Sequence, residues 1–361
     1  MVIRNTQGQQ ELKFFIKCKQ KEKFKMYNKV IIITICLFAG CNMDTNDNNE
    51  NNLSSNSFAL CEGNFNNGNA SLWSFSPDLG ESEVQIIGGT SLGDVAQSFT
   101  IHDSYLYVVV NNSHKIEVLN LNDENFVDGT ISMAGASPRY FVTDGEIGYV
   151  SCWNLNGILV LNISTRSITD TISIPGKPEN LILEGGSLYA SIPFASDWST
   201  SKEVVEISTI SKQITNTYEV IPGPRDMELH GSNLYVSSSY YDANYVTYTG
   251  LSKIDLTDKN VITYLDASGS IAKDDIIKID EKLYRSTSTG IARIKEDLSL
   301  DLDNIIGDKK NVYSVYANDA YLFFGTTGDY IAPDTVYVTD HSGNVINQFV
   351  VGAIPGDFIS Q

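Results

Sequence analysis

The sequence predicts an all-β fold, a seven-bladed β-propeller spanning residues 57–361. Two observations support this. Short runs rich in β-branched and aromatic residues, bounded by Asp, Ser or Asn, are typical of strands, and a unit of three such runs lies between Ala96 and Leu121. Similar units recur at intervals of roughly 40–50 residues, which is typical of propeller blades. No long amphipathic helical pattern competes with them.

Each repeat carries an aromatic marker near the start of its second strand. The seven markers are Phe58, Tyr107, Tyr149, Tyr189, Tyr235, Tyr284 and Tyr321. A third strand is expected after each marker, at 70–76, 115–121, 157–163, 203–208, 251–256, 290–294 and 335–340. From the second blade on, the inner strands are expected to start at Ala96, Pro138, Pro178, Pro224, Lys273 and Lys310. Six or eight blades are the alternatives, because the last two copies lack the proline.

The two ends of the repeat region complement one another. The C-terminal segment Ile354–Phe358 matches the inner strand of a blade, whereas the first repeat begins at a second strand, with Phe58. We therefore expect the C-terminal strand to complete blade 1 and close the ring. Closure would leave no open sheet edge between the first and last blades.

Residues 1–40 are expected to be an N-terminal extension followed by a signal peptide. Residues 1–25 are polar and basic, and we expect translation to start at Met26. The apolar run at 30–39 has the length of a signal-peptide core and is too short to span a bilayer as a helix.

The segment Leu37–Cys41 resembles a bacterial lipobox, in which signal peptidase II cleaves before a cysteine that carries lipid. The resemblance implies that Cys41 is lipidated and anchors the chain to a membrane. The alternative is an ordinary signal peptide with an incidental cysteine.

Residues 41–56 are expected to form a disordered tether, because they contain too few apolar side chains to fold. Asp44, Asp47 and Glu50 follow the cysteine closely and resemble the surface-export signal of Bacteroidota lipoproteins. Simple solvation of a linker explains them equally well. The expected location is the outer membrane, with the periplasmic and the cell-surface side both open.

The charge balance argues against a nucleic-acid partner. The chain has 44 acidic and 25 basic residues and a formal net charge of −19, so it would repel a polyanion. The propeller region contains two cysteines, Cys61 and Cys152, at equivalent places in blades 1 and 3. Because blade 2 separates them by more than a disulfide can bridge, we expect two free, buried thiols.

The sequence contains no strong catalytic or metal-binding motif. The four histidines lie mainly at expected turns, and neither HxH nor HExxH spacing occurs. Asp274 and Asp275 are neighbours only in sequence, since adjacent strand residues face opposite sides. We therefore expect no catalytic residue, no metal site and no cofactor.

A polar ring is expected at the mouth of the central channel. In a propeller, the loops that enter the inner strands share one face with the loops between the second and third strands. The residues that follow the entry positions are Gln97, Arg139, Glu179, Arg225, Asp274 and Asn311. This ring of mixed charge suits a polar ligand, although the groups could instead satisfy one another.

Loops between the second and third strands add aromatic and amide side chains to the same face. The residues expected to contribute to ligand binding are Asn64, Phe65, Asn111, Trp153, Trp198 and Tyr241. Exposed aromatic rings beside amides are typical of a ligand or partner surface. The alternative is that some of these rings pack down on the propeller.

Several motifs resemble one family. The segments Glu62–Phe65, Leu92–Val95, Tyr107–Asn111 and Ile354–Phe358 are similar to those of the YVTN/YncE-like seven-bladed propeller lipoproteins of the Bacteroidota, whose repeats are WD40-like. The family includes BtuG-type surface proteins, which capture vitamin B12 and pass it to a TonB-dependent outer-membrane transporter. The resemblance implies a ligand-binding module, with a corrinoid as the candidate ligand and a TonB-dependent transporter as the candidate partner. We expect the protein to be a monomer.

Two other functions compete with this interpretation. YVTN-like propellers also resemble lactonases and quinoprotein dehydrogenases, which would make the protein an enzyme. A protein-interaction scaffold of the cell envelope is the third hypothesis. A large apolar patch around Trp153 and Trp198 would favour the scaffold, whereas a compact pocket would favour small-molecule binding.

Overall fold

The computed structural model describes residues 57–77, 85–87, 92–122, 127–266 and 273–361. The expectations for the start at Met26, the signal peptide, the lipidated Cys41 and the tether lie outside these residues. Within the described ranges, no helix has the length and apolar character needed to cross a membrane.

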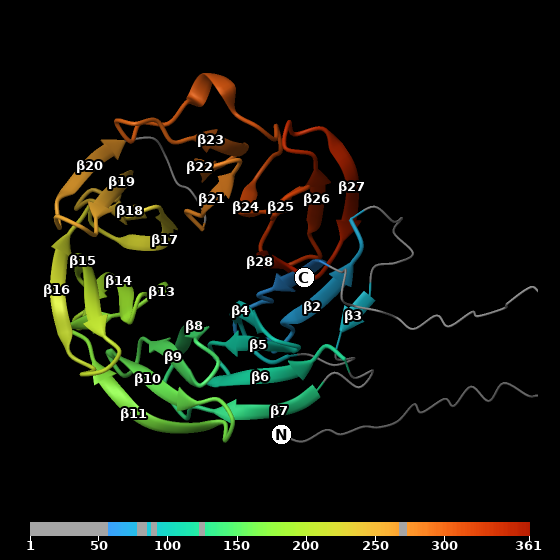
Figure 1. The fold of residues 1–361 in the computed structure, drawn as a ribbon. Helices are drawn as coiled ribbons and strands as arrows, with labels where there is room; N and C mark the ends of the chain where they lie inside the picture. The colour runs from blue at the N-terminus through green and yellow to red at the C-terminus, as the bar shows by residue number, and fades with distance from the viewer. Residues whose placement is uncertain (1–56, 78–84, 88–91, 123–126, 267–272) are drawn as a thin grey trace, which may run out of the picture. The chain divides into compact units, whose positions relative to one another are not determined.

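Seven antiparallel sheets are arranged as the blades of a β-propeller (Figure 1). Blade 1 contains β28 (Pro355–Ser360), β1 (Ser57–Cys61), β2 (Ser71–Phe75) and β3 (Gln85–Ile87). Blade 2 contains β4 (Ala96–His102), β5 (Tyr105–Val110), β6 (Lys115–Asn120) and β7 (Val127–Ser132). Blade 3 contains β8 (Pro138–Thr143), β9 (Ile147–Cys152), β10 (Gly157–Asn162) and β11 (Ser167–Ser173). Blade 4 contains β12 (Gly176–Lys177), β13 (Leu181–Glu184), β14 (Ser187–Ala195), β15 (Thr200–Ser208) and β16 (Ile214–Glu219).

The remaining blades follow the same order from the centre outward (Figure 1). Blade 5 contains β17 (Pro224–His230), β18 (Asn233–Tyr241), β19 (Thr247–Asp255) and β20 (Val261–Asp266). Blade 6 contains β21 (Ile276–Ile279), β22 (Lys282–Thr287) and β23 (Gly290–Arg293), followed by the 3₁₀ turn η3 (Leu302–Asn304). Blade 7 contains β24 (Val312–Ala317), β25 (Leu322–Thr326), β26 (Thr335–Thr339) and β27 (Val345–Val350). The prediction of a seven-bladed propeller is confirmed.

Blade 1 joins the two ends of the described chain. Strand β28 pairs with β1 in antiparallel register, with Phe58 opposite Ile359 and Ser57 opposite Ser360. The amide of Glu62 also donates to the carbonyl of Ile354 over 2.8 Å. The prediction that the C-terminal strand closes the ring is confirmed.

Blade 6 departs from the four-stranded pattern. Among the described residues it has three strands, and two isolated bridges stand where a fourth would pair: Ile291 with Ile306, and Ile294 with Leu300. The turn η3 interrupts the chain between them.

The expected register of blade 7 was wrong by two residues. Val312 pairs with Thr326 as Ala96 pairs with Val110 in blade 2. The structural equivalent of the marker Tyr107 is therefore Phe323 and not Tyr321. Four successive apolar residues, 321–324, conceal the alternation that would otherwise fix the register.

The core lies between the blades. Phe58 and Leu60 of blade 1 share a buried cluster with Leu106 and Val108 of blade 2, and similar clusters join the other neighbours. Because both faces of a blade are covered, the middle strands are nearly continuously apolar.

The cysteines at 61 and 152 are buried and unpaired, as predicted. Burial raises the pKa of both thiols well above the ordinary value, which makes them poor nucleophiles.

Candidate functional site

A cavity of about 400 Å³ opens on the face where the chain enters the inner strands. All seven blades contribute to it. Its lining comprises Glu62, Gly63, Phe65, Val95, Gln97, Asn111, Arg139, Tyr140, Glu179, Arg225, Asp226, Lys273, Tyr313 and Ile354. Both its size and its position are typical of small-molecule sites.

Four of the six residues expected in the polar ring line this cavity: Gln97, Arg139, Glu179 and Arg225. Three of them follow the first residue of an inner strand, and Glu179 lies between β12 and β13. Side chains alternate along a strand, so the same position of each blade faces the same way. This repetition brings together side chains from four different blades.

Asn311 does not line the cavity, which corrects the expectation for blade 7. It is exposed, has a φ of +56°, and precedes β24. With the register set by Val312 opposite Thr326, the equivalent of Gln97 is Tyr313, and Tyr313 does line the cavity.

Asp274 is also displaced from the expected ring. It is fully buried, and its Oδ1 accepts a hydrogen bond of 3.0 Å from Nη2 of the buried Arg285. In blade 6 the inner strand β21 begins only at Ile276, and Asp274 before it has a φ of +63°. The side chain of Asp274 is buried, and Lys273 lines the cavity instead.

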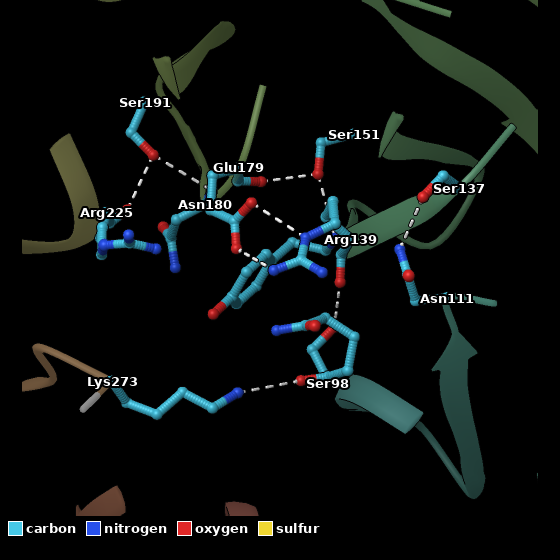
Figure 2. Close-up of polar contacts among 12 residues, drawn as sticks. Ser98, Asn111, Ser137, Arg139, Ser151, Glu179, Asn180, Ser191, Arg225 and Lys273 are labelled. Atoms are coloured by element: carbon cyan, nitrogen blue, oxygen red, sulfur yellow. Dashed lines mark hydrogen bonds and ion pairs between the residues drawn. The ribbon is translucent and has the colours of Figure 1, made fainter. Parts of the chain in front are cut away.

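Arg139 and Glu179 form a two-pronged ion pair, drawn at the centre of Figure 2. Arg139 donates from Nε over 2.9 Å and from Nη2 over 2.6 Å. The side chains are only 12% and 6% exposed. Burial lowers the pKa of Arg139, and Glu179 more than offsets this. The guanidinium is thus charged, paired and fixed.

A second ion pair lies across blades 1, 6 and 7. Lys273 Nζ is 2.7 Å from Glu62 Oε1, which also accepts a hydrogen bond of 3.1 Å from the Tyr313 hydroxyl. The ring position of blade 1 is Gly356, where an added Cβ would lie 2.5 Å from Glu62 Oε1. Glycine therefore leaves the space that Glu62 fills. Sequence reasoning missed Glu62 because it comes from a different loop.

Arg225 and Gln97 differ from these pairs. Arg225 donates from Nε to Ser239 Oγ over 2.9 Å, and the same Nε lies 3.6 Å from Oδ2 of Asp274. Its two terminal nitrogens hydrogen-bond to no described residue. Gln97 is 5% exposed, and its side-chain amide likewise has no partner among the described residues.

Three aspartates at one repeated position join neighbouring blades. Oδ2 of Asp226, Asp275 and Asp357 accepts a hydrogen bond from an amide of the next inner strand. The donors and distances are Ile276 at 2.8 Å, Val315 at 2.8 Å and Phe99 at 3.3 Å. Burial raises the pKa of Asp226 to about 6, that of Asp357 to about 7 and that of Asp275 well above its usual value. The repeated Pro-x-Asp at 224–226 and 355–357 is the signal that could have revealed them.

The tryptophans pack on the rim and do not line the cavity. Trp153 meets Phe194 and Trp198 edge-on, with ring centroids 5.9 and 5.5 Å apart. Arg139 lies 4.0 Å from the centroid of the Trp153 ring, and Lys177 lies 4.0 Å from that of Trp198. Trp198 keeps 54% of its surface exposed. This cluster stiffens the Arg139 side of the site and offers one open ring.

The remaining residues expected at this face have different surroundings. Asn111 lines the cavity and donates to Ser137 Oγ and to the carbonyl of Pro138, both over 2.9 Å. Phe65 also lines the cavity, with 68% of its surface exposed. Asn64 donates to the carbonyl of Tyr330, and Tyr241 is exposed outside the lining.

Comparison with solved structures supports the fold. A quinoprotein alcohol dehydrogenase-like protein of Bacteroides thetaiotaomicron has a TM-score of 0.63 at 12% identity, over 86% of this chain and 79% of that one. A 6-phosphogluconolactonase-like protein of Bacteroides fragilis has a TM-score of 0.59 at 14% identity, over 85% of this chain and 98% of that one. BamB of Moraxella catarrhalis has a TM-score of 0.50 at 13% identity, over 81% of this chain and 87% of that one. No protein-family model and no curated protein matches the sequence.

These identities are low, so the likeness shows a shared propeller fold and nothing about chemistry. The three matched proteins also differ in the function that their names suggest. One is named after a dehydrogenase and one after a lactonase, and BamB is named after neither. The function of this chain must therefore be argued from its own cavity.

Proposed function

We propose that this protein is a lipid-anchored binding module of the outer membrane that captures a small nutrient in the axial cavity for a TonB-dependent transporter. The observation that carries the binding role is the cavity of about 400 Å³ lined by every blade, in which the terminal nitrogens of Arg225 and the amide of Gln97 bond to no described residue. Such groups can hydrogen-bond to a ligand and fix its orientation. The lipobox-like segment at 37–41 supports the anchor.

A corrinoid is the specific ligand that the family resemblance suggests. A whole corrinoid is larger than the cavity of about 400 Å³, so its ring would lie across the mouth, with one peripheral side chain inserted. Phe65 and Trp198 are exposed on this face and would supply apolar contact area for the ring.

An enzymatic role has one observation in its favour, namely that Asp226 lines the cavity with its pKa raised by burial to about 6. A general base needs such a pKa. Both of its oxygens, however, already accept hydrogen bonds, from Asn180 Nδ2 over 2.9 Å and from the amide of Ile276 over 2.8 Å. Binding is therefore the better supported role.

Titration calorimetry of the purified chain with cobalamin and cobinamide tests the corrinoid proposal. We expect binding that is lost in an Arg139→Ala/Arg225→Ala double variant and kept in Arg293→Ala, which removes an exposed arginine of β23 outside the cavity lining. A thermal melt of each variant checks the fold. Absence of binding at high micromolar corrinoid would exclude corrinoid capture.

A further inference from the structure

The cavity wall holds one cation that no carboxylate satisfies by hydrogen bonding. Of the described cations that line it, Arg139 is held by Glu179 and Lys273 by Glu62. Arg225 has Asp274 no closer than 3.6 Å, and Oδ1 of that carboxylate already accepts a shorter bond of 3.0 Å from a buried arginine of β22. An anion that enters the cavity therefore meets one cation whose carboxylate partner is 3.6 Å away and shared with a second arginine.

The way Arg225 is held sets the geometry of that charge. Its Nε is occupied by Ser239 Oγ at 2.9 Å, which orients the guanidinium plane. The two terminal nitrogens have no partner among the described residues, Arg225 lines the cavity, and its side chain is 32% exposed. Two parallel N–H donors match the two oxygens of a planar carboxylate.

A second unpaired group lies elsewhere on the wall. Gln97 comes from blade 2, whereas Arg225 comes from blade 5, so at least two blades separate them around the ring. The Gln97 amide can donate one hydrogen bond and accept another. A ligand that satisfies both residues must carry a neutral polar group some way from its charged end.

The charges on the cavity wall and the volume of the cavity restrict the class of ligand further. A dianion such as phosphate would need a second free cation, and Arg139 and Lys273 are already paired. Asp226 on the same wall, with its pKa raised by burial to about 6, would repel a second negative charge at neutral pH. A cavity of about 400 Å³ has room for a small metabolite or for one arm of a larger ligand.

We propose that the axial cavity binds a small monocarboxylate that also carries an amide or hydroxyl group. Its carboxylate lies on the two terminal nitrogens of Arg225 and its neutral polar group lies on Gln97. This inference rests on the proposed binding function and names the ligand class of the same site.

Ligand-observed NMR on the full chain tests the class, with N-acetylglycine as the acid and N-acetylglycinamide as its neutral match. We expect the acid to bind at least about tenfold more tightly, because the amide cannot form the charged pair. Inorganic phosphate is expected not to displace the acid. Equal binding of acid and amide, or displacement by phosphate, would overturn the proposal.

Variants assign the two contacts. Arg225→Gln should weaken the binding of N-acetylglycine by about tenfold or more. Arg225→Lys should weaken this binding less, and Arg293→Gln should leave it unchanged. Gln97→Leu should reduce the preference for N-acetylglycine over acetate, which has no amide. If Arg225→Gln does not melt like the wild type, Arg225→Lys and Gln97→Leu decide. Unchanged binding in every folded variant would refute the assignment.

The outcomes separate this inference from the proposed function. Binding of cobinamide without binding of N-acetylglycine would leave the binding module standing and remove the monocarboxylate class. Binding of neither would remove both.

Discussion

Arg139 and Arg225 occupy the same position in blades 3 and 5, yet their surroundings differ. Arg139 is held by two hydrogen bonds to Glu179 and lies over the Trp153 ring. Arg225 is hydrogen-bonded at Nε alone, to the Ser239 hydroxyl, and its carboxylate neighbour Asp274 lies 3.6 Å from that nitrogen. The repeat thus determines where an arginine is presented, and the next blade determines whether its charge is already satisfied. The first arginine belongs to the framework of the site, and the second is available to a ligand.

The largest expected effect comes from breaking the satisfied pair. Glu179→Gln leaves the buried Arg139 without a counter-charge, and we expect the free energy of unfolding to fall by about 3 kcal/mol. Urea denaturation followed by tryptophan fluorescence measures it.

Glu219→Gln is the matched control. It removes the carboxylate of an exposed ion pair, in which Glu219 is 74% and Lys202 is 55% exposed. The substitution should lower the free energy of unfolding by less than about 1 kcal/mol. Equal losses in the two variants would contradict a framework role for Arg139.

The second effect concerns Asp357, one of the three aspartates that accept a hydrogen bond from the next inner strand. Burial raises the pKa of Asp357 to about 7, so the folded state favours its protonated form. Its contribution to stability is complete below the unfolded pKa near 4 and is lost as pH rises through about 7. We expect the free energy of unfolding to fall from pH 4 to 8 through this group.

Denaturation at several pH values, in the wild type and in Asp357→Asn, isolates that contribution. Asn cannot ionise but keeps an oxygen for the amide of Phe99. The difference between the two proteins should change with pH between about 4 and 7. A constant difference would show that Asp357 does not titrate in this range.

The smallest effect is expected at the available arginine. Arg225→Gln should change the free energy of unfolding by no more than about 0.5 kcal/mol, because Asp274 keeps its bond to Arg285. The same denaturation experiment measures it. A loss as large as that of Glu179→Gln would mean that Arg225 belongs to the framework, and the contrast between the two arginines would disappear.

The repeat was readable from the sequence because blade strands are local. Each marker aromatic lies within or beside a short run of β-forming residues, and strands such as β6 and β10 appear where such runs predict them. The register of strand pairing was harder to predict from the sequence. In blade 7 the continuous apolar run at 321–324 carries no alternation, and only pairing with β24 fixes it.

The site was predicted in part for the same reason. Gln97, Arg139, Glu179 and Arg225 follow regular entry positions, so counting from the markers placed them on one face. Asp274 lies at the position that counting gives, but it precedes β21 with a φ of +63°, and its side chain is fully buried. Glu62 reaches the cavity from a loop because Gly356 leaves space, a relation between residues far apart in sequence.

The sequence by itself determined the all-β class, the number of repeats, the closure by the C-terminal strand and most of the side chains presented to the axis. These follow from strand propensity and spacing, which act over a few residues. Only the tertiary structure decided which charges are paired. Ion pairs such as Lys273 with Glu62 and Arg139 with Glu179 join different blades, and their geometry exists only once the ring has closed. The availability of the two terminal nitrogens of Arg225 is therefore a property of the assembled propeller.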